Sequence, residues 1–318
     1  MRDSYNRVID YLRISVTDLC NLRCRYCMPS GGVKRMGRSK VLTSEEIVRL
    51  AREFVALGIK KVRITGGEPL LRPGIVDLIK SIAKIDGLED LALTTNGLLL
   101  KEYGAKLKEA GLRRVNVSID TLDPVKYRYI TRGGDLNLVL AGLEEADRVG
   151  LTPVKLNVVL MKDFNEDEIQ YFVNLTKEKE IDVRFIELMP IGEMVAWSYS
   201  RLVSNRLVLD KVKGLERVAS KDKSSPAVYY KLPQGKGKVG LINPLSCKFC
   251  QNCNRVRLTA DAKMKLCLHS NQMIDLRKTL RSGGDLRSKI LTSIYEKPLE
   301  HDLEGGGFSK RDMFQIGG

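Results

Sequence analysis

Three cysteines near the start of the chain are the residues best suited to chemistry. Cys20, Cys24 and Cys27 are separated by three and two residues and follow an apolar run. Three thiolates on one short loop can converge on a single inorganic centre. A [4Fe–4S] cluster normally takes four cysteines, so three leave one iron open to a small molecule. The alternatives are a zinc site that lacks one ligand and three reduced cysteines that are close by chance.

A second group comprises Cys247, Cys250, Cys253 and Cys267. Four thiolates suit a closed tetrahedral zinc site or a fully ligated [4Fe–4S] cluster. A third option uses only the last three cysteines and leaves one iron open to a substrate. The residue types alone do not choose among these.

Up to about residue 190, the sequence pattern predicts alternating strands and helices, and these elements must position the cysteines. Strands are expected at residues 8–16, 61–65, 91–95, 114–119, 154–160 and 183–188, and helices at about 44–57, 74–85, 101–110, 136–149 and 166–177. Such alternation predicts a parallel sheet of right-handed βαβ units. Six units are too few for the eight of a closed barrel, so we expect a curved, partly open barrel.

Polar residues follow nearly every expected strand, where the chemistry of parallel α/β folds gathers. The second strand ends in Gly66-Gly67-Glu68, the third in Thr94-Thr95-Asn96, and the fourth in Ser118-Ile119-Asp120. Paired glycines allow backbone to approach a ligand where a Cβ would clash. The sequence therefore predicts one site at the carboxyl ends of the strands.

The pattern changes after Pro190. Residues 191–223 are expected to form a connecting segment that could hold one helix. Two hairpins are expected after it, one from residues 228–232 and 239–241 and one from residues 255–259 and 264–268. Two short helices are expected at residues 275–281 and 285–295. We expect a core domain over residues 1–200 and a smaller domain over residues 201–318.

Composition narrows the function classes. The chain has 54 Lys+Arg against 39 Asp+Glu, a formal charge of +15, which suits nucleic acid, an anionic membrane or a phosphorylated small molecule. The basic residues are scattered, so we expect neither a nucleic-acid nor a membrane partner, and a phosphate pocket needs only a few of them. Seven cysteines in two tight groups make a poor disulfide framework, and the polar amino terminus lacks a signal peptide's apolar stretch. We expect a protein of the reducing cytoplasm.

The first cysteine group, with Tyr26 before the last cysteine, resembles the signature of the radical S-adenosylmethionine (SAM) superfamily. In that superfamily the open iron is chelated by the amino and carboxylate groups of SAM. The reduced cluster cleaves SAM to methionine and a 5′-deoxyadenosyl radical, which abstracts hydrogen from the substrate.

Further motifs make the chain similar to the GTP 3′,8-cyclase family. They are Arg-x-Ser-Val-Thr-Asp-x-Cys-Asn over 13–21, Tyr-Cys-Met-Pro over 26–29, Arg-Ile-Thr-Gly-Gly-Glu-Pro-Leu over 63–70, Leu-Thr-Thr-Asn-Gly over 93–97, Arg-Arg-Val-Asn-Val-Ser over 113–118, Arg-Phe-Ile-Glu-x-Met over 184–189, the cysteine motif over 249–258 with Cys267, and a terminal Ile-Gly-Gly. The resemblance implies a six-unit partial β/α barrel of the radical SAM type, with a smaller C-terminal α+β domain that carries a second iron–sulfur cluster.

The resemblance also implies roles for individual residues. Two [4Fe–4S] clusters would be held by Cys20, Cys24 and Cys27 and by Cys250, Cys253 and Cys267, and SAM would contact Tyr26, Gly67, Ser118 and Met189. GTP would contact Arg13, Arg63, Thr94, Lys155 and the run Arg255, Val256 and Arg257, and Arg255 and Arg257 would also steer the radical chemistry. Gly317-Gly318 would enter the cavity. Cys247 departs from the family pattern, and we expect it not to be a ligand.

The implied reaction converts GTP to (8S)-3′,8-cyclo-7,8-dihydroguanosine 5′-triphosphate, the first step of molybdenum cofactor biosynthesis. Implied partners are a reducing electron-donor protein, a second copy of the chain in a homodimer, and a downstream pyranopterin-forming enzyme. The alternative within the superfamily is a peptide-modifying enzyme with an auxiliary cluster. The rival from another class is a zinc-bearing nucleic-acid-binding protein that exploits the positive charge.

Overall fold

A computed structural model describes residues 1–32, 36–220, 222, 224–301 and 309–317. Its strands form one twelve-stranded sheet in the order β12-β11-β10-β1-β2-β3-β4-β5-β6-β9-β8-β7. The strands are β1 (Tyr11–Ser15), β2 (Lys61–Thr65), β3 (Asp90–Thr95), β4 (Arg114–Ser118), β5 (Val154–Leu160), β6 (Ile181–Glu187), β7 (Glu216–Val218), β8 (Ala227–Lys231), β9 (Val239–Ile242), β10 (Arg255–Leu258), β11 (Lys263–Lys265) and β12 (Ile274–Asp275).

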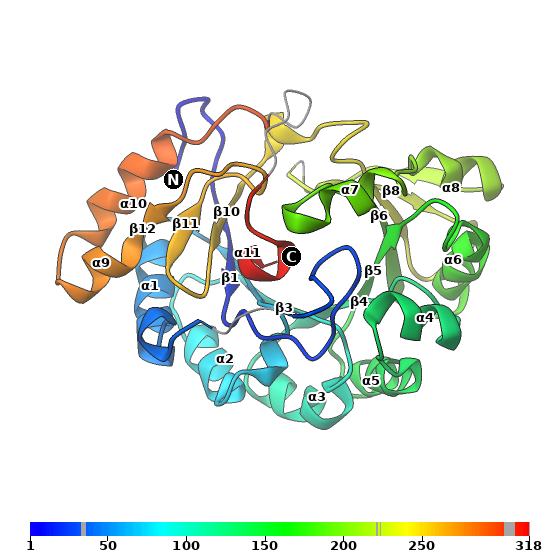
Figure 1. The fold of residues 1–318 in the computed structure, drawn as a ribbon, viewed down its shortest axis with the longest axis horizontal. Coiled ribbons are helices and arrows are strands. Elements are labelled where there is room, and N and C mark those ends of the chain that lie inside the picture. The colour runs from blue at the N-terminus through cyan, green and yellow to red at the C-terminus, as the bar shows by residue number, and fades with distance from the viewer. Residues whose placement is uncertain (33–35, 221, 223, 302–308, 318) are drawn as a thin grey trace.

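Strands β1 to β6 run parallel and follow chain order across the middle of the sheet. Figure 1 shows the sheet curving into an open barrel, with helices along its outer side. The helices are α1 (Ser44–Ala56), α2 (Ile75–Ala83), α3 (Leu100–Glu109), α4 (Pro124–Thr131), α5 (Leu136–Arg148), α6 (Ile169–Glu178), α7 (Val195–Tyr199), α8 (Arg206–Lys211), α9 (Leu276–Arg281), α10 (Leu286–Tyr295) and α11 (Met313–Ile316). The expected partial barrel of six βα units is confirmed.

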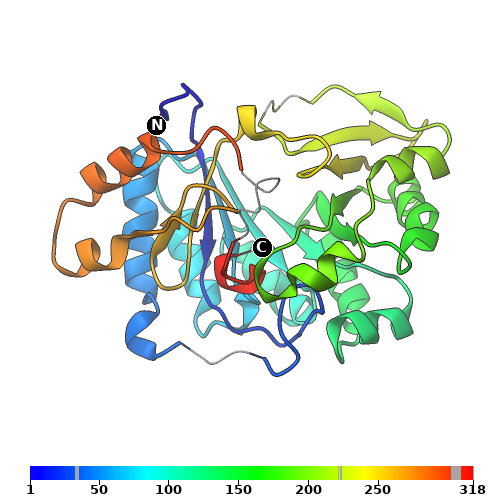
Figure 2. The ribbon, with the colours of Figure 1, turned by 45° about the horizontal axis from the view of Figure 1, so that its top comes forward.

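The C-terminal region continues the same sheet at both edges. Strand β9 pairs in parallel with β6, and β10 pairs in parallel with β1. The two expected hairpins are present as β8–β9 and β10–β11, both antiparallel. Figures 1 and 2 both show α11 lying inside the curve of the sheet, so the chain ends within the barrel.

Local sequence explains how the barrel wall forms, and helix α1 is an example. Thr43 accepts a hydrogen bond from the Glu46 amide, and the Glu46 carboxylate accepts one from the Thr43 amide. This capping box satisfies two amides that the helix itself leaves unpaired, and losing such a cap typically costs about 1 kcal/mol. Ile47, Leu50 and Phe54 then recur on one face and are fully buried against the sheet.

Several expected boundaries were wrong. Strand β1 begins at Tyr11 rather than Val8, because the chain turns at Asn6 (φ 64°) and Val8 forms only an isolated bridge with Arg2. Helix α4 was not anticipated, although Asp123 caps it and Pro124 occupies its first turn. The described part of 191–223 contains helices α7 and α8, a 3₁₀ helix at Gly192–Met194 and strand β7.

Within the described residues, no helix is long and apolar enough to cross a membrane.

Candidate active site

One cavity inside the barrel is lined by six of the seven cysteines, all but Cys247. Alternate residues of β1, β2 and β10 face it, while the residues between them, such as Leu12 and Ile14, are fully buried. The strand ends and the C-terminal segment complete the lining with Thr94, Asn96, Ser118, Asp120, Met189, Met313 and Phe314. The polar strand ends that the sequence indicated therefore meet in one place.

The first cysteine loop is fixed by backbone hydrogen bonds. The Cys27 and Met28 amides donate to the Cys24 carbonyl at 2.9 and 3.0 Å, forming a tight turn. The Arg25 amide donates to the Ile130 carbonyl at 2.9 Å, which ties the loop to α4. Burial raises the pKa of Cys20 to about 11 and that of Cys27 to about 12. A thiol that coordinates a cation loses its proton, so Cys20 and Cys27 are thiolates only when a cation is bound.

The glycine pair after β2 packs directly against the residues that precede Cys20. A Cβ on Gly67 would collide with the Leu19 carbonyl oxygen, so glycine is required at this position. The next residue, Glu68, is fully buried and accepts hydrogen bonds from Thr95 Oγ1 at 2.8 Å and the Asn96 amide at 2.7 Å. Burial raises the pKa of Glu68 to about 7. Through these hydrogen bonds Glu68 connects the end of β2 to the end of β3, next to the cysteine loop.

Tyr26 connects the same loop to the opposite wall. Its hydroxyl donates to Asp120 Oδ2 at 2.7 Å, and Asp120 Oδ1 accepts from the Val159 amide at 2.9 Å. Burial raises the pKa of Asp120 to about 6. Ser118 and Met189 line the cavity beside this contact.

A row of arginines crosses the floor of the cavity. Arg257 on β10, Arg13 on β1 and Arg63 on β2 are in-register neighbours, and Arg184 on β6 lines the same cavity. Burial and the neighbouring arginines lower the pKa of Arg63 and of Arg257 to about 10. Among the residues that the structure describes, Arg63 Nε and Arg184 Nε and Nη2 are buried without a hydrogen-bond partner. Like charges opposite one another on a sheet are destabilising, so the row suits a polyanionic ligand.

The second cysteine site lies on the same cavity. Cys250, Cys253 and Cys267 line it, and the Cys253 amide closes a turn by donating to the Cys250 carbonyl at 3.0 Å. Burial acts to raise the pKa of Cys253, but the positive charges of Lys297 and Arg255 outweigh it and leave that pKa lowered. The positive charges of Lys297 and Arg255 thus act on Cys253, whereas burial raises the pKa of Cys250.

The cavity brings together most of the residues that the sequence pointed to. They are Arg13, Cys20, Cys24, Tyr26, Cys27, Arg63, Gly67, Thr94, Ser118, Met189, Cys250, Cys253, Arg255, Arg257 and Cys267. Their roles remain proposals.

Lys155, Val256 and Cys247 do not line the cavity. Lys155 Nζ lies 3.3 Å from Asp182 Oδ2, with which it forms an ion pair. Val256 is fully buried in the core, because it alternates with the inward-facing Arg255 and Arg257. Cys247 is exposed to solvent.

The C-terminal segment enters the cavity at the arginine row. Arg257 Nη1 donates to the Gly317 carbonyl. Gly317 has φ 75°, and a Cβ there would collide with Thr65 Oγ1. Gly318 lies outside the described residues.

Other lining residues were missed from the sequence, notably Tyr11, Arg184, His269 and His301. The first two face the interior from strands that were expected, so alternation along those strands was the available signal. The two histidine rings lie 4.9 Å apart between centroids, and His301 Nε2 is 3.0 Å from the Pro244 carbonyl. Burial lowers the pKa of His269 to about 3. They are the chain's two histidines. No sequence motif contains both of them, so their proximity could not be predicted.

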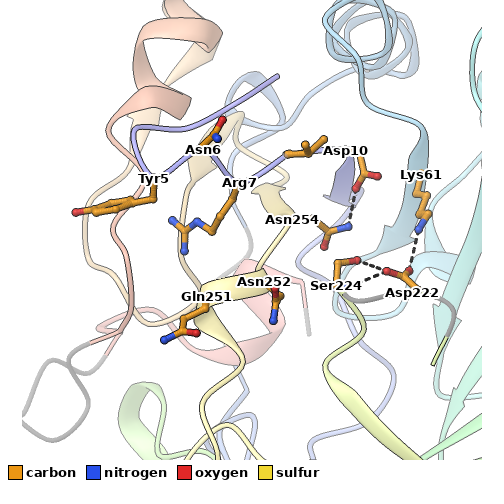
Figure 3. Close-up of a pocket in the computed structure, with 11 residues that line it drawn as sticks. Tyr5, Asn6, Arg7, Asp10, Lys61, Asp222, Ser224, Gln251, Asn252 and Asn254 are labelled. Carbon is orange, nitrogen blue, oxygen red and sulfur yellow. Dashed lines mark hydrogen bonds and ion pairs between the residues drawn. The ribbon is translucent and has the colours of Figure 1, made fainter. Parts of the chain in front are cut away.

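A second pocket lies at the amino-terminal ends of β1 and β2, outside the second cysteine loop. Figure 3 shows Arg7, Lys61, Asp222 and Asn254 around it, together with Gln251 and Asn252. The last two residues separate Cys250 from Cys253, so the cysteine loop reaches the surface here.

Two family models match the chain. The radical SAM superfamily model matches residues 14–176, and the model described as Molybdenum Cofactor Synthesis C matches residues 181–303.

Curated relatives match over the full length. A GTP 3′,8-cyclase of Peptoclostridium acidaminophilum is 58% identical and aligns with 99% of this chain and 98% of its own. A GTP 3′,8-cyclase of Alkaliphilus oremlandii is 56% identical over the whole of both chains.

Solved structures share the fold at low identity. The crystal structure of Streptococcus suis SuiB has a TM-score of 0.63 and 15% identity, covering 92% of this chain and 67% of that chain. At this identity the likeness concerns the fold alone.

Proposed function

The chain belongs to the GTP 3′,8-cyclase family of the radical SAM superfamily, and we propose that the barrel cavity is where it cyclises GTP. The reaction forms (8S)-3′,8-cyclo-7,8-dihydroguanosine 5′-triphosphate, the first step of molybdenum cofactor biosynthesis. The arginine row carries the assignment of the cavity to GTP, because buried guanidinium groups in register need an anion such as a triphosphate.

The donor set fits the cofactors of the family, two [4Fe–4S] clusters and SAM. Cys20, Cys24 and Cys27 would hold the first cluster, since all three line the cavity from one loop and Cys24 and Cys27 share a turn. When bound, that cluster and SAM supply the 5′-deoxyadenosyl radical that takes hydrogen from the substrate. Tyr26, Gly67, Ser118 and Met189 would contact SAM. The close approach of Gly67 to Leu19 leaves backbone, rather than side chain, facing the ligand.

Cys250, Cys253 and Cys267 would hold the second cluster beside the guanine base. Arg255 and Arg257 line the cavity from β10, directly after the turn of Cys250 and Cys253, and Arg257 also belongs to the arginine row. We assign them the catalytic role of holding GTP and stabilising negative charge as the substrate is reduced. Arg offers a planar fork to phosphate oxygens, which Lys does not.

The GTP contacts are supplied by Arg13, Arg63 and Thr94, to which the cavity adds Arg184 and Asn157. Lys155 and Val256, at positions that the resemblance implied, would act indirectly. Lys155 is held on β5 by Asp182, and the Val256 backbone lies between the two β10 arginines.

The peptide-modifying alternative has less support than the cyclase. The solved structures share only the fold, whereas the cyclase relatives align over the whole chain. As partners we propose a reducing electron-donor protein, a second copy of the chain and a downstream pyranopterin-forming enzyme. The reducing cytoplasm is the proposed compartment, in keeping with seven cysteines that form no disulfide.

The deciding experiment is anaerobic reconstitution with iron and sulfide, followed by incubation with SAM, dithionite and GTP. We expect about eight irons per chain, four for each cluster, and a cyclised guanosine product that mass spectrometry and NMR identify. Reactions without SAM serve as the control. If 5′-deoxyadenosine forms but GTP is recovered unchanged, the substrate assignment is wrong.

A further inference from the structure

Arg7 lies outside the motifs that identify the family and is buried against the second cysteine loop. It precedes β1 and is 8% exposed, and Figure 3 shows it beside Gln251 and Asn252. Arg7 Nη1 donates to the Cys250 carbonyl at 2.8 Å and to the Leu299 carbonyl at 2.7 Å. Arg7 Nη2 donates to the Pro298 carbonyl at 2.7 Å.

The positive charge of Arg7 is balanced within its own segment. Arg7 Nε donates to Asp3 Oδ2 at 2.6 Å, and Asp3 is 4% exposed. A buried ion pair adds little net stability over a well-packed apolar pair, but removing one partner is costly. The charge of Arg7 still lowers the pKa of Cys253, but less than Lys297 and Arg255 do. Its larger effect is geometric, because one planar fork joins the amino terminus, the Cys250 loop and residues 298–299.

Lys297 supplies a second positive charge next to this joint. It is 2% exposed, and its Nζ donates to the Leu266 carbonyl, immediately before Cys267. A positive charge close to an iron–sulfur cluster favours its reduced form, since reduction adds negative charge. Arg7 and Lys297 thus touch the backbone beside two of the three cysteines from two remote parts of the chain.

We propose that Arg7 and Lys297 are positioning residues for the second cluster, Arg7 by fixing the Cys250 loop and Lys297 by raising the reduction potential of the cluster. This inference rests on the proposed second cluster. The two residues act through the cysteine loop and Leu266 and do not touch GTP.

The test compares Arg7→Met and Lys297→Met with wild type after anaerobic reconstitution. Arg7→Met is expected to lose about half of the iron, about four of eight atoms, while SAM cleavage by the first cluster persists. Lys297→Met is expected to keep its iron and to shift the second cluster to lower potential in EPR-monitored titration. Arg2→Ala and Lys289→Met are the matched controls, because both residues are exposed basic residues of the same segments.

Full iron in Arg7→Met together with an unshifted potential in Lys297→Met would overturn the proposal. If Arg7→Met yields no folded protein, Arg7→Lys decides, since it keeps the charge beside Asp3 but lacks the fork. Full occupancy of the second cluster in that variant also counts against Arg7. Wild type with only about four irons instead contradicts the proposed function, so the two failures are distinguishable.

Discussion

Arg13 on β1 and Arg63 on β2 are in-register neighbours whose side chains enter the same cavity. Two guanidinium groups placed this way repel each other, and Arg257 extends the row on β10. The free protein therefore carries an electrostatic cost that a bound polyanion removes. Binding and stability should respond in opposite ways when one member of the row is lost.

Arg63→Ala should weaken GTP binding by about 2–5 kcal/mol, the cost of losing a desolvated charge-assisted contact. The same variant should leave the melting temperature of ligand-free protein unchanged or raised, because repulsion is relieved. Equilibrium dialysis with GTP and thermal denaturation measure the two effects. Arg63→Lys should restore little binding, and Arg148→Ala, which alters an exposed arginine on α5, is the control. Equal GTP affinity in Arg63→Ala and wild type would remove this residue from the site.

Cys24→Ala should abolish formation of 5′-deoxyadenosine, because two thiolates on the loop cannot hold the first cluster. Iron content should fall by about half, to about four atoms, with the second cluster still visible by EPR. Chromatography of the nucleoside product and iron analysis check this together. SAM cleavage at the normal rate would contradict the assignment of the first site.

Cys247→Ser should retain both clusters and GTP cyclisation, because Cys247 is exposed and does not line the cavity. Cys250→Ser, Cys253→Ser and Cys267→Ser should each lose the second cluster. Iron analysis and Mössbauer spectra of the four variants compare them directly. Loss of iron in Cys247→Ser would favour a fully ligated auxiliary cluster, and with it the peptide-modifying alternative.

Gly317→Ala should reduce GTP cyclisation much more than it reduces stability or SAM binding. Its Cβ would collide with Thr65 Oγ1 and displace the carbonyl that Arg257 contacts. Gly283→Ala is the matched control, since Gly283 has φ 72° and nothing within 4 Å of an added Cβ. Product yield and melting temperature are measured for both. Deletion of Gly317-Gly318 should behave like Gly317→Ala, and full activity after deletion would make the tail dispensable.

Glu68 should make cluster-free protein less stable as the pH rises. Burial raises the pKa of Glu68 to about 7 in the folded chain, so the folded state binds its proton more tightly than the unfolded state does. Stability is therefore highest below the unfolded pKa and falls through the window up to about pH 7, by about 3 kcal/mol in all at about 1.4 kcal/mol per pH unit. Denaturant unfolding between pH 4.5 and 8 should show a steeper loss of stability in wild type than in Glu68→Gln, which keeps only the smaller dependence that the raised pKa of Asp120 causes. Parallel pH profiles for the two proteins would contradict it.

The sequence predicted the barrel well because its strands are short and apolar and alternate with amphipathic helices. The two groups of cysteines could also be recognised from the sequence, since the spacing of cysteines within one loop is a local property. Alternation along β1 and β10 placed Arg13 and Arg257 inward and Val256 in the core, although the family motif had grouped Val256 with its neighbours.

Features that depend on distant segments could not be predicted in this way. The pairing of β10 with β1 decides that Arg257 and Arg13 are neighbours, and no local pattern encodes that register. The same holds for His269 and His301, and for the contact of Arg7 with Cys250, which spans 243 residues. The ion pair with Asp182 that draws Lys155 away from the cavity is likewise set by strand register.

The placement of β9 and β10 on opposite edges of the six-stranded core has a consequence for biosynthesis. Until residues 239–258 have left the ribosome, β1 and β6 are both open edges, which invite pairing with other chains. Contacts between such remote segments also form slowly, because a long loop must close first. The order of synthesis therefore delays maturation: the second cysteine group emerges only with the strands that close the edges. We therefore expect the two sites to acquire their metal, and the open strand edges to be covered, at the same late stage of synthesis.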